Sequence, residues 1–209
     1  MSPLLSRFNS GTKRLLDILL GLLALLLCAP VLLLLYGLLC LQGGRPLFGH
    51  VRVGRHGRTF HCYKFRTMYV DAEQRLAELL ARDPEARRQW QQDFKLKQDP
   101  RVTPLGAFLR KSSLDELPQL WNVLRGQMSL VGPRPVVSEE LPRYGEALAS
   151  YLAVRPGITG LWQVSGRNDT SYAQRVALDA HYVRNWSLWL DITILLRTCL
   201  VVLNRRGAY

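Results

Sequence analysis

The hydrophobic pattern of this chain changes abruptly at about residue 41. Residues 15–41 read LLDILLGLLALLLCAPVLLLLYGLLCL, an almost uninterrupted apolar run. A helix of this length can cross the hydrocarbon core of a bilayer. The remaining chain alternates short apolar stretches with charged ones, as a domain that faces water does. The pattern therefore predicts an N-terminal membrane anchor over residues 1–44 and a cytoplasmic domain over residues 45–209.

Two features of the apolar run argue against a straight membrane span. Pro30 lies near its middle, where proline kinks or breaks a helix. Both flanks are basic, with Arg7, Lys13 and Arg14 before the run and Arg45, Arg52, Arg55 and Arg58 after it. Basic flanks favour the cytoplasmic face, so the segment would enter the membrane, bend near Ala29-Pro30 and return. A straight span stays an alternative, because transmembrane helices tolerate proline.

The cytoplasmic domain begins with a predicted β-hairpin over residues 47–69, where two alternating stretches flank the glycine turn GRHGR. Residues 71–97 predict two helices, the second starting at Asp83-Pro84 as an N-cap and a first-turn proline. A short amphipathic helix is expected at 105–111, another short helix at 139–151, and a loop with a short strand at 155–168. The expected fold class is α+β and mainly helical.

The C-terminal residues 182–206 predict one long amphipathic helix. Trp186 and Trp189 accompany leucines and arginines in this stretch, a composition typical of helices that lie at a membrane interface. The density of leucine and valine also fits a buried core helix. The sequence thus predicts interfacial amphipathic helices and leaves the core alternative open.

Composition narrows the class of partner. The 209 residues include 28 basic and 16 acidic ones, for a formal net charge of +12. Such a balance indicates an anionic partner, which is nucleic acid, anionic lipid or a phosphorylated substrate. The cations are spread among loops and no nucleic-acid motif is present, so no nucleic acid is expected. The four cysteines form no C-x-x-C pair, which argues against a disulfide framework or a zinc site.

The stretch SSLDELPQLWNV at residues 112–123 places Asp115 beside Glu116, just before an apolar helical segment. One explanation is helix capping, with Ser112, Ser113 or Asp115 as the cap. Pro118 favours Ser112 or Asp115 as that cap, because proline is tolerated best in a first turn. The other explanation is that the two carboxylates carry chemistry.

Cations that suit phosphate groups surround this stretch in the sequence. Lys64 and Arg66 in KFRTM share one face of a strand, and Arg110 precedes the acids. Arg134 lies between two prolines in VGPRP, which would hold its guanidinium ready for an anion. A solvated strand and a surface arginine are the simpler alternatives. Carboxylates that suit a divalent metal complete the set, among them Asp179 and Asp191 near the C-terminus.

Three segments in this order, KFRTM, SLDELPQLWNVLRGQMSLVGPRP and RPGITGLWQVSGRN, resemble the bacterial sugar transferases of the monotopic phosphoglycosyl transferase family. The resemblance covers the chain from about Thr12 to Tyr209. It implies a re-entrant membrane helix followed by a small cytoplasmic catalytic domain. The family's helix break often carries a Ser-Pro pair, whereas this chain has Ala29-Pro30. That difference removes a serine hydroxyl from the bend and leaves the proline.

The resemblance also implies residue roles. Asp115 would be the catalytic nucleophile, and Glu116 would support a Mg²⁺ site. The expected substrate-binding residues are Lys64, Arg66, Arg110, Lys111, Arg134 and Arg167. The expected metal ligands are Asp115, Glu116, Asp179 and Asp191, although the last two could equally be surface or capping acids. A helix N-terminus and the nearby Arg110 and Lys111 would favour the ionised form of Asp115.

The activity so implied is transfer of a sugar-1-phosphate, with galactose or glucose as the sugar, from a UDP-sugar to polyprenyl (undecaprenyl) phosphate. UMP would leave, and the step would open exopolysaccharide, capsule or O-antigen synthesis at the cytoplasmic face of the bacterial inner membrane. Two alternatives stay open: a metal-dependent polyprenyl-diphosphate phosphatase and a basic membrane-binding protein. The sequence does not decide the sugar or the oligomeric state, for which a homodimer is one option.

Overall fold

The computed structural model describes residues 11–93, 96, 99–166 and 170–203. Its elements in chain order are α2 (Gly11–Leu41), β1 (Leu47–Val53), η1 (Arg55–Gly57), β2 (Thr59–Phe65), α3 (Ala72–Arg82), α4 (Pro84–Asp93), α5 (Pro104–Ser112), η2 (Leu114–Glu116), α6 (Gln119–Leu124), β3 (Ser129–Val131), η3 (Ser138–Ala147), α7 (Leu148–Ala153), β4 (Gly157–Thr159), α8 (Leu161–Val164), α9 (Tyr172–Arg184) and α10 (Leu188–Leu203). The chain is mainly helical with little strand, as predicted.

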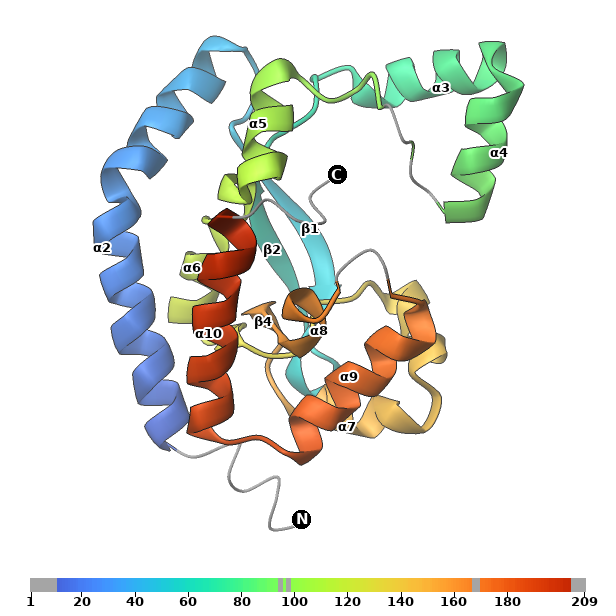
Figure 1. The fold of residues 1–209 in the computed structure, drawn as a ribbon. Coiled ribbons are helices and arrows are strands. Elements are labelled where there is room, and N and C mark those ends of the chain that lie inside the picture. Colours follow the sequence, from blue (N-terminus) through green and yellow to red (C-terminus); the bar gives the residue numbers. More distant parts are fainter. Residues whose placement is uncertain (1–10, 94–95, 97–98, 167–169, 204–209) are drawn as a thin grey trace.

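The N-terminal helix α2 runs along one side of the molecule, and its C-terminal part bends towards α5 (Figure 1). It contains Pro30 and is continuous through it. It is long and apolar enough to cross a membrane, and its leucines are mostly exposed, Leu27 and Leu33 by 72% and 73%. Such exposure of large apolar side chains indicates contact with lipid or with another apolar surface. Re-entry into the membrane stays a prediction.

Both ends of α2 contact the rest of the domain. Near the N-terminal end, the Asp17 carboxylate accepts hydrogen bonds from the Ser129 hydroxyl and the Leu130 amide, at 2.9 and 3.0 Å. Towards the C-terminal end, Leu39 is fully buried in a cluster with Phe65 and Leu109. A helix of 31 residues is about 46 Å long, so these contacts lie far apart along it.

The predicted hairpin is confirmed. Strands β1 and β2 pair antiparallel in a two-stranded sheet, with Leu47 opposite Phe65 and Val53 opposite Thr59. Gly57 at the turn has φ +74°, a conformation that favours glycine. Phe60 and Cys62 face inward and pack with Val123 of α6. The hairpin lies at the centre of the molecule (Figure 1).

The two predicted helices over 71–97 are confirmed as α3 and α4, which project from the domain as a pair (Figure 1). Asp83 caps α4 as expected, since its Oδ1 accepts hydrogen bonds from the Glu85 and Ala86 amides at 2.8 and 3.1 Å. Pro84 is the first residue of that helix. The predicted helix at 105–111 is also present, as α5, with Thr103 as its N-cap.

Two predictions for the C-terminal half were partly wrong. The segment at 139–151 is a 3-10 helix followed by α7, because Gly145 interrupts it with φ +48°. The long helix predicted over 182–206 is divided between α9 and α10, and its last three residues lie outside the described chain. Ser187 starts α10, because its hydroxyl accepts a hydrogen bond from the Leu190 amide at 3.1 Å.

The C-terminal core forms around a parallel strand pair that the sequence did not predict fully. Strands β3 and β4 pair in parallel, with Ser129 opposite Gly157. Val131 of β3 packs against Tyr182 of α9 and Ile194 of α10. On the outside of α10, Trp189, Ile192, Leu196 and Leu200 are exposed. An interfacial position for α10 stays a prediction.

Candidate active site

A pocket of about 1540 Å³ lies between the hairpin β1–β2, the start of α3, the turn after α5, the loop before η3, and α8. Six of the predicted site residues line it: Lys64, Arg66, Arg110, Asp115, Glu116 and Arg134. Pockets for one drug-sized ligand usually measure about 300–1,000 Å³. This pocket is therefore large enough for a nucleotide sugar and a further group beside it.

The two carboxylates lie in a tight turn between helices. Ser113 ends α5 in the left-handed conformation, with φ +57°, and Leu114–Glu116 then form the 3-10 turn η2. Pro118 is the N-cap residue of helix α6, and no side chain caps that helix with a hydrogen bond. The capping explanation for SSLDELPQ is thus wrong, since the Ser112 hydroxyl instead bonds the carbonyls of its own helix.

Asp115 is a buried carboxyl, with 9% of its surface exposed. Burial raises its pKa from an ordinary 3.8 to about 6, and Glu116 acts in the same direction. Lys64 and Arg110 act in the opposite direction. Arg110 favours the ionised form of Asp115 as expected, but desolvation outweighs the cations, so the pKa of Asp115 rises overall. With this pKa, roughly nine in ten Asp115 carboxyls are still ionised at about pH 7.

Glu116 is paired with a strand lysine. The Lys64 Nζ lies 2.5 Å from Glu116 Oε1, and both side chains are about one-third exposed (32% each). Arg110 projects from α5 and donates from Nε to the Thr67 hydroxyl at 3.0 Å. Its guanidinium also interacts electrostatically with Asp115. The carboxylate pair is thus flanked by a cation on each of two elements, β2 and α5.

Arg134 lies on the pocket wall between Pro133 and Pro135. Its guanidinium carbon lies 5.6 Å from the centroid of the Trp162 ring, within the range of a cation–π contact. The prolines restrict its backbone and the indole supports its side chain. Arg134 is therefore held in one place on the wall, as a group that binds a phosphate would have to be.

The other predicted cations differ in position. Arg66 lines the pocket, but its Nη2 donates to the carbonyls of Leu39 and Gly43, so it ties the C-terminal end of α2 to the hairpin. Lys111 is exposed on α5 and is absent from the pocket lining. Arg167 lies outside the described residues.

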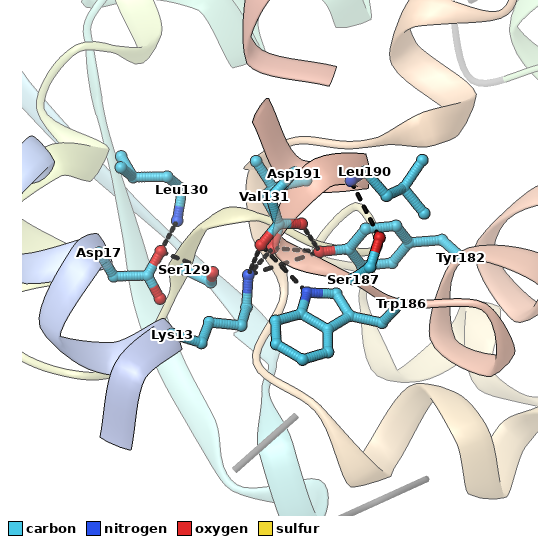
Figure 2. Close-up of polar contacts among 10 residues, drawn as sticks. All are labelled: Lys13, Asp17, Ser129, Leu130, Val131, Tyr182, Trp186, Ser187, Leu190 and Asp191. Carbon is cyan, nitrogen blue, oxygen red and sulfur yellow. Dashed lines mark hydrogen bonds and ion pairs between the residues drawn. The ribbon is translucent and has the colours of Figure 1, made fainter. Parts of the chain in front are cut away.

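Asp179 and Asp191 do not join the carboxylate pair. Asp191 accepts hydrogen bonds from Lys13, Tyr182 and Trp186, at 2.6, 2.6 and 3.0 Å (Figure 2). Asp179 is buried and accepts one from the Tyr144 hydroxyl at 2.8 Å. Neither lines the pocket, since each is engaged by residues of other elements. We therefore correct the expectation that they belong to a common metal site.

Across the part of the chain that the structure describes, no group of three or more histidine, cysteine, aspartate or glutamate side chains is arranged to hold a metal ion. Asp115 and Glu116 remain as two carboxylates in one pocket. Mg²⁺ is commonly bound by one or two carboxylates together with substrate phosphates and water. The pair fits that mode of binding and does not fit a metal held by protein side chains alone.

Trp162 and Gln163, in the segment RPGITGLWQVSGRN, both line the pocket, although the sequence pattern predicted no role for either. Arg175 was not predicted either. It is a buried arginine whose guanidinium carbon lies 5.0 Å from the Trp162 ring centroid and whose Nη1 donates to Glu140 at 3.2 Å. An available signal was the S-x-x-Q sequence at 171–174, which caps α9 and so predicts the helix that carries Arg175.

Comparison with known proteins agrees with this architecture. The model of the bacterial sugar transferase family matches residues 8–205. The chain is 60% identical to an uncharacterized sugar transferase of Haemophilus influenzae over 94% of its length, and 54% identical to an undecaprenyl-phosphate galactose phosphotransferase of Salmonella typhimurium over 99%. It is 52% identical to an exopolysaccharide production protein of Sinorhizobium fredii over 95% of its length.

The chain spans 42% and 43% of the length of the first two relatives and 88% of the third. The matched part of this chain includes all of the pocket-lining residues and α2. A match that extends from the first described helix to the last, over the pocket and both strand pairs, shows that the chain belongs to the bacterial sugar transferase family.

Proposed function

We propose that this protein transfers a hexose-1-phosphate, galactose- or glucose-1-phosphate, from a UDP-sugar to undecaprenyl phosphate and releases UMP. The observation that carries the proposal is the pair Asp115–Glu116, one buried and the other bound to Lys64, in a pocket lined by cations. The names of the relatives support the lipid carrier and the galactose, since one is an undecaprenyl-phosphate galactose phosphotransferase and another a UDP-galactose-lipid carrier transferase.

In the first step, an Asp115 carboxylate oxygen attacks the phosphorus that carries the sugar. The new bond joins this oxygen to phosphorus, and the bond from phosphorus to the oxygen bridging towards UMP breaks. UMP leaves with the electron pair. The Asp115 carboxylate must be ionised for this attack, and its raised pKa makes it more nucleophilic than an ordinary aspartate at the same ionised fraction.

In the second step, a phosphate oxygen of the lipid carrier attacks the same phosphorus. The bond between phosphorus and Asp115 breaks, which regenerates the carboxylate and yields the lipid diphosphate sugar. A covalent intermediate lets one pocket receive a soluble donor and a lipid acceptor in turn. The pocket is large enough to hold either the UDP-sugar or the phosphate end of the lipid carrier beside the turn η2.

The cations would hold the phosphates in place. Arg134 and Arg110 line the pocket, and their fixed guanidinium groups suit phosphate oxygens. Lys64 would offset the negative charge that the donor brings near Glu116. Magnesium, held by Asp115 and Glu116 together with the donor's phosphate oxygens, would neutralise the diphosphate so that an anionic nucleophile could approach it.

The attachment of α2 at both of its ends supports a monotopic position at the cytoplasmic face of the inner membrane. Asp17 near one end and Leu39 near the other both contact the same domain. If α2 crossed the bilayer, one of these contacts would have to be on the far side. A helix that enters and leaves the same leaflet, bending at Pro30, keeps both contacts and exposes its leucines to lipid.

A donor panel tests the activity. The full chain in bacterial membranes, incubated with undecaprenyl phosphate and separate UDP-sugars, should release UMP with UDP-galactose or UDP-glucose and form the lipid diphosphate sugar. Arg134→Ala should abolish this release while the protein still extracts and folds normally. Release of inorganic phosphate from undecaprenyl diphosphate, with no UMP from any UDP-sugar, would instead identify a phosphatase and refute the proposal.

Topology is tested separately by labelling. Cysteines introduced at Ser6 and Gly57 in a cysteine-free background should both react with an impermeant reagent from the cytoplasmic side. Labelling of the two positions from opposite sides would rule out re-entry. Pro30→Ala should move the segment towards a straight span, because it removes the residue that interrupts the helical hydrogen bonds.

A further inference from the structure

The side chain of Asn122 in α6 forms an unusual set of contacts with β2. Asn122 is fully buried. Its Oδ1 accepts a hydrogen bond from the Tyr63 amide at 3.0 Å, and its Nδ2 donates to the His61 carbonyl at 2.7 Å. The same Nδ2 donates to Gln127 Oε1 at 2.7 Å. The donor and acceptor groups of this amide therefore have partners in β2 and in the loop after α6.

These contacts replace a neighbouring strand. Within the described chain the hairpin sheet has two strands, so one edge of β2 faces β1 and the other does not. The Arg66 amide donates towards β1, to the Pro46 carbonyl at 2.8 Å. Because backbone groups alternate along a strand, Tyr63 and His61 direct their amide and carbonyl to the other edge. Asn122 meets both groups as a paired strand would.

The position of this contact matters for the carboxylate pair. Lys64 directly follows Tyr63 in β2, and Asp115 and Glu116 lie in the turn that leads into α6. The Lys64–Glu116 ion pair of 2.5 Å joins β2 to η2, and Asn122 joins β2 to α6, the helix that follows η2. A shift of β2 along α6 by one hydrogen-bond length would separate Lys64 from Glu116.

We propose that Asn122 is a positioning residue for the carboxylate pair: its amide fixes β2 against α6 and so keeps Lys64 on Glu116. The inference rests on the proposed function, in which this pair performs the chemistry. Asn122 itself does not line the pocket, so it acts through Lys64. Without it, Lys64 moves away from Glu116, and the phosphate groups of the donor lose a cation beside the carboxylate pair.

The test compares two variants. Asn122→Leu keeps nearly the same shape and removes the side-chain hydrogen bonds, and Asn122→Ser places a shorter side chain with a hydroxyl at the same position. The control is Tyr151→Phe, which removes a buried hydroxyl that bonds the Val53 carbonyl and the Val136 amide, away from the pocket. The assay is UMP release at a single pH, with kcat and KM separated and the thermal midpoint of each variant recorded.

Both Asn122 variants should lower kcat about ten-fold with little change in donor KM. Tyr151→Phe should lower the thermal midpoint and leave kcat unchanged. In a Lys64→Met background, the Asn122 substitutions should lower kcat no further. Wild-type kcat in a folded Asn122 variant, or an equal loss of kcat without Lys64, would overturn the proposal.

If both Asn122 variants fail to fold, Asn122→Asp keeps the shape and the bond from the Tyr63 amide but cannot donate to the His61 carbonyl. A lower kcat that is absent in the Lys64→Met background supports the proposal, and an unchanged kcat overturns it. A crystal structure of the folded variant supplies a readout besides activity: a distance from Lys64 Nζ to Glu116 beyond about 4 Å supports the proposal, and an intact ion pair overturns it. If wild-type protein releases no UMP, the proposed function fails, and the crystal structure still decides whether Asn122 holds Lys64 on Glu116.

Discussion

The contact between α2 and the C-terminal helices makes a quantitative prediction. We call the residues Lys13, Tyr182, Trp186 and Asp191 the Lys13 cluster. Lys13 and Asp191 are 2.6 Å apart, with side chains only 8% and 11% exposed. Lys13 also donates to the Val131 carbonyl at 3.2 Å. Figure 2 shows these side chains converging from α2, α9, α10 and the segment between them.

Lys13→Met should destabilise the protein by about 3–5 kcal/mol, because it leaves the buried Asp191 carboxylate without its counter-ion. The hydrogen bonds from Tyr182 and Trp186 remain and limit the loss. In Lys13→Met with Asp191→Asn the buried charge is also gone. That double variant should recover about 1–3 kcal/mol of the loss, a coupling of the size found for residues in contact.

The assay is denaturant unfolding in mild detergent. Unfolding is followed by circular dichroism and not by tryptophan fluorescence, because Trp186 belongs to the Lys13 cluster and its emission would respond to the substitution itself. The matched control is Arg75→Met, which breaks the exposed Asp71–Arg75 pair of 2.9 Å on α3. It should leave the unfolding free energy unchanged within error, since exposed ion pairs contribute little. A loss below about 1 kcal/mol for Lys13→Met, or a double variant whose loss equals the sum of the single ones, would refute the reasoning.

Four further predictions follow from the pocket and its surroundings. Asp115→Asn should stabilise the protein by up to about 3 kcal/mol above about pH 6, because the raised pKa of Asp115 makes ionisation of the folded protein's carboxyl unfavourable there. The gain should vanish below about pH 4, where the carboxyl is protonated in both the folded and the unfolded state. A gain in unfolding free energy that does not change with pH would contradict this. For the wild type, kcat/KM should fall about ten-fold per pH unit below about pH 6, and a flat profile would exclude Asp115 as the ionising group. Arg134→Lys should lower kcat/KM by about ten-fold or more, because lysine lacks the planar group that lies over Trp162; wild-type kinetics would remove Arg134 from the site. Tyr144→Phe should cost about 1.5–3 kcal/mol in thermal unfolding through the lost hydrogen bond to Asp179, and an unchanged midpoint would show that this bond contributes nothing.

Local patterns predicted the elements whose determinants are local. The hairpin was predictable because alternating residues flank a glycine turn, and α4 because Asp83-Pro84 carries both of its start signals. The break between α9 and α10 was not, since apolar residues continue on both sides of it and only Ser187 marks the new start. The parallel pair β3–β4 joins residues almost thirty positions apart, beyond any local pattern.

The residues of the site also divide into those that local motifs predict and those that depend on tertiary packing. Asp115, Glu116, Lys64 and Arg134 were recognised from motifs, and the structure brings them to one pocket. The direction of the Asp115 pKa could not be predicted, because it depends on burial by elements distant in sequence. The place of Asp191 was also hidden, since its partner Lys13 is 178 positions away. Tertiary packing decided which acids line the pocket and which hold the helices together.

Trapping the intermediate tests whether Asp115 carries the phosphosugar. Protein mixed with UDP-galactose or UDP-glucose labelled in the sugar-bearing phosphate, without lipid acceptor, is quenched rapidly and digested. We expect one equivalent of UMP to be released per active site and the label to lie on the peptide that contains Asp115, with both lost in Asp115→Asn. Absence of label together with intersecting kinetic lines for donor and acceptor would contradict it, because a covalent intermediate requires parallel lines.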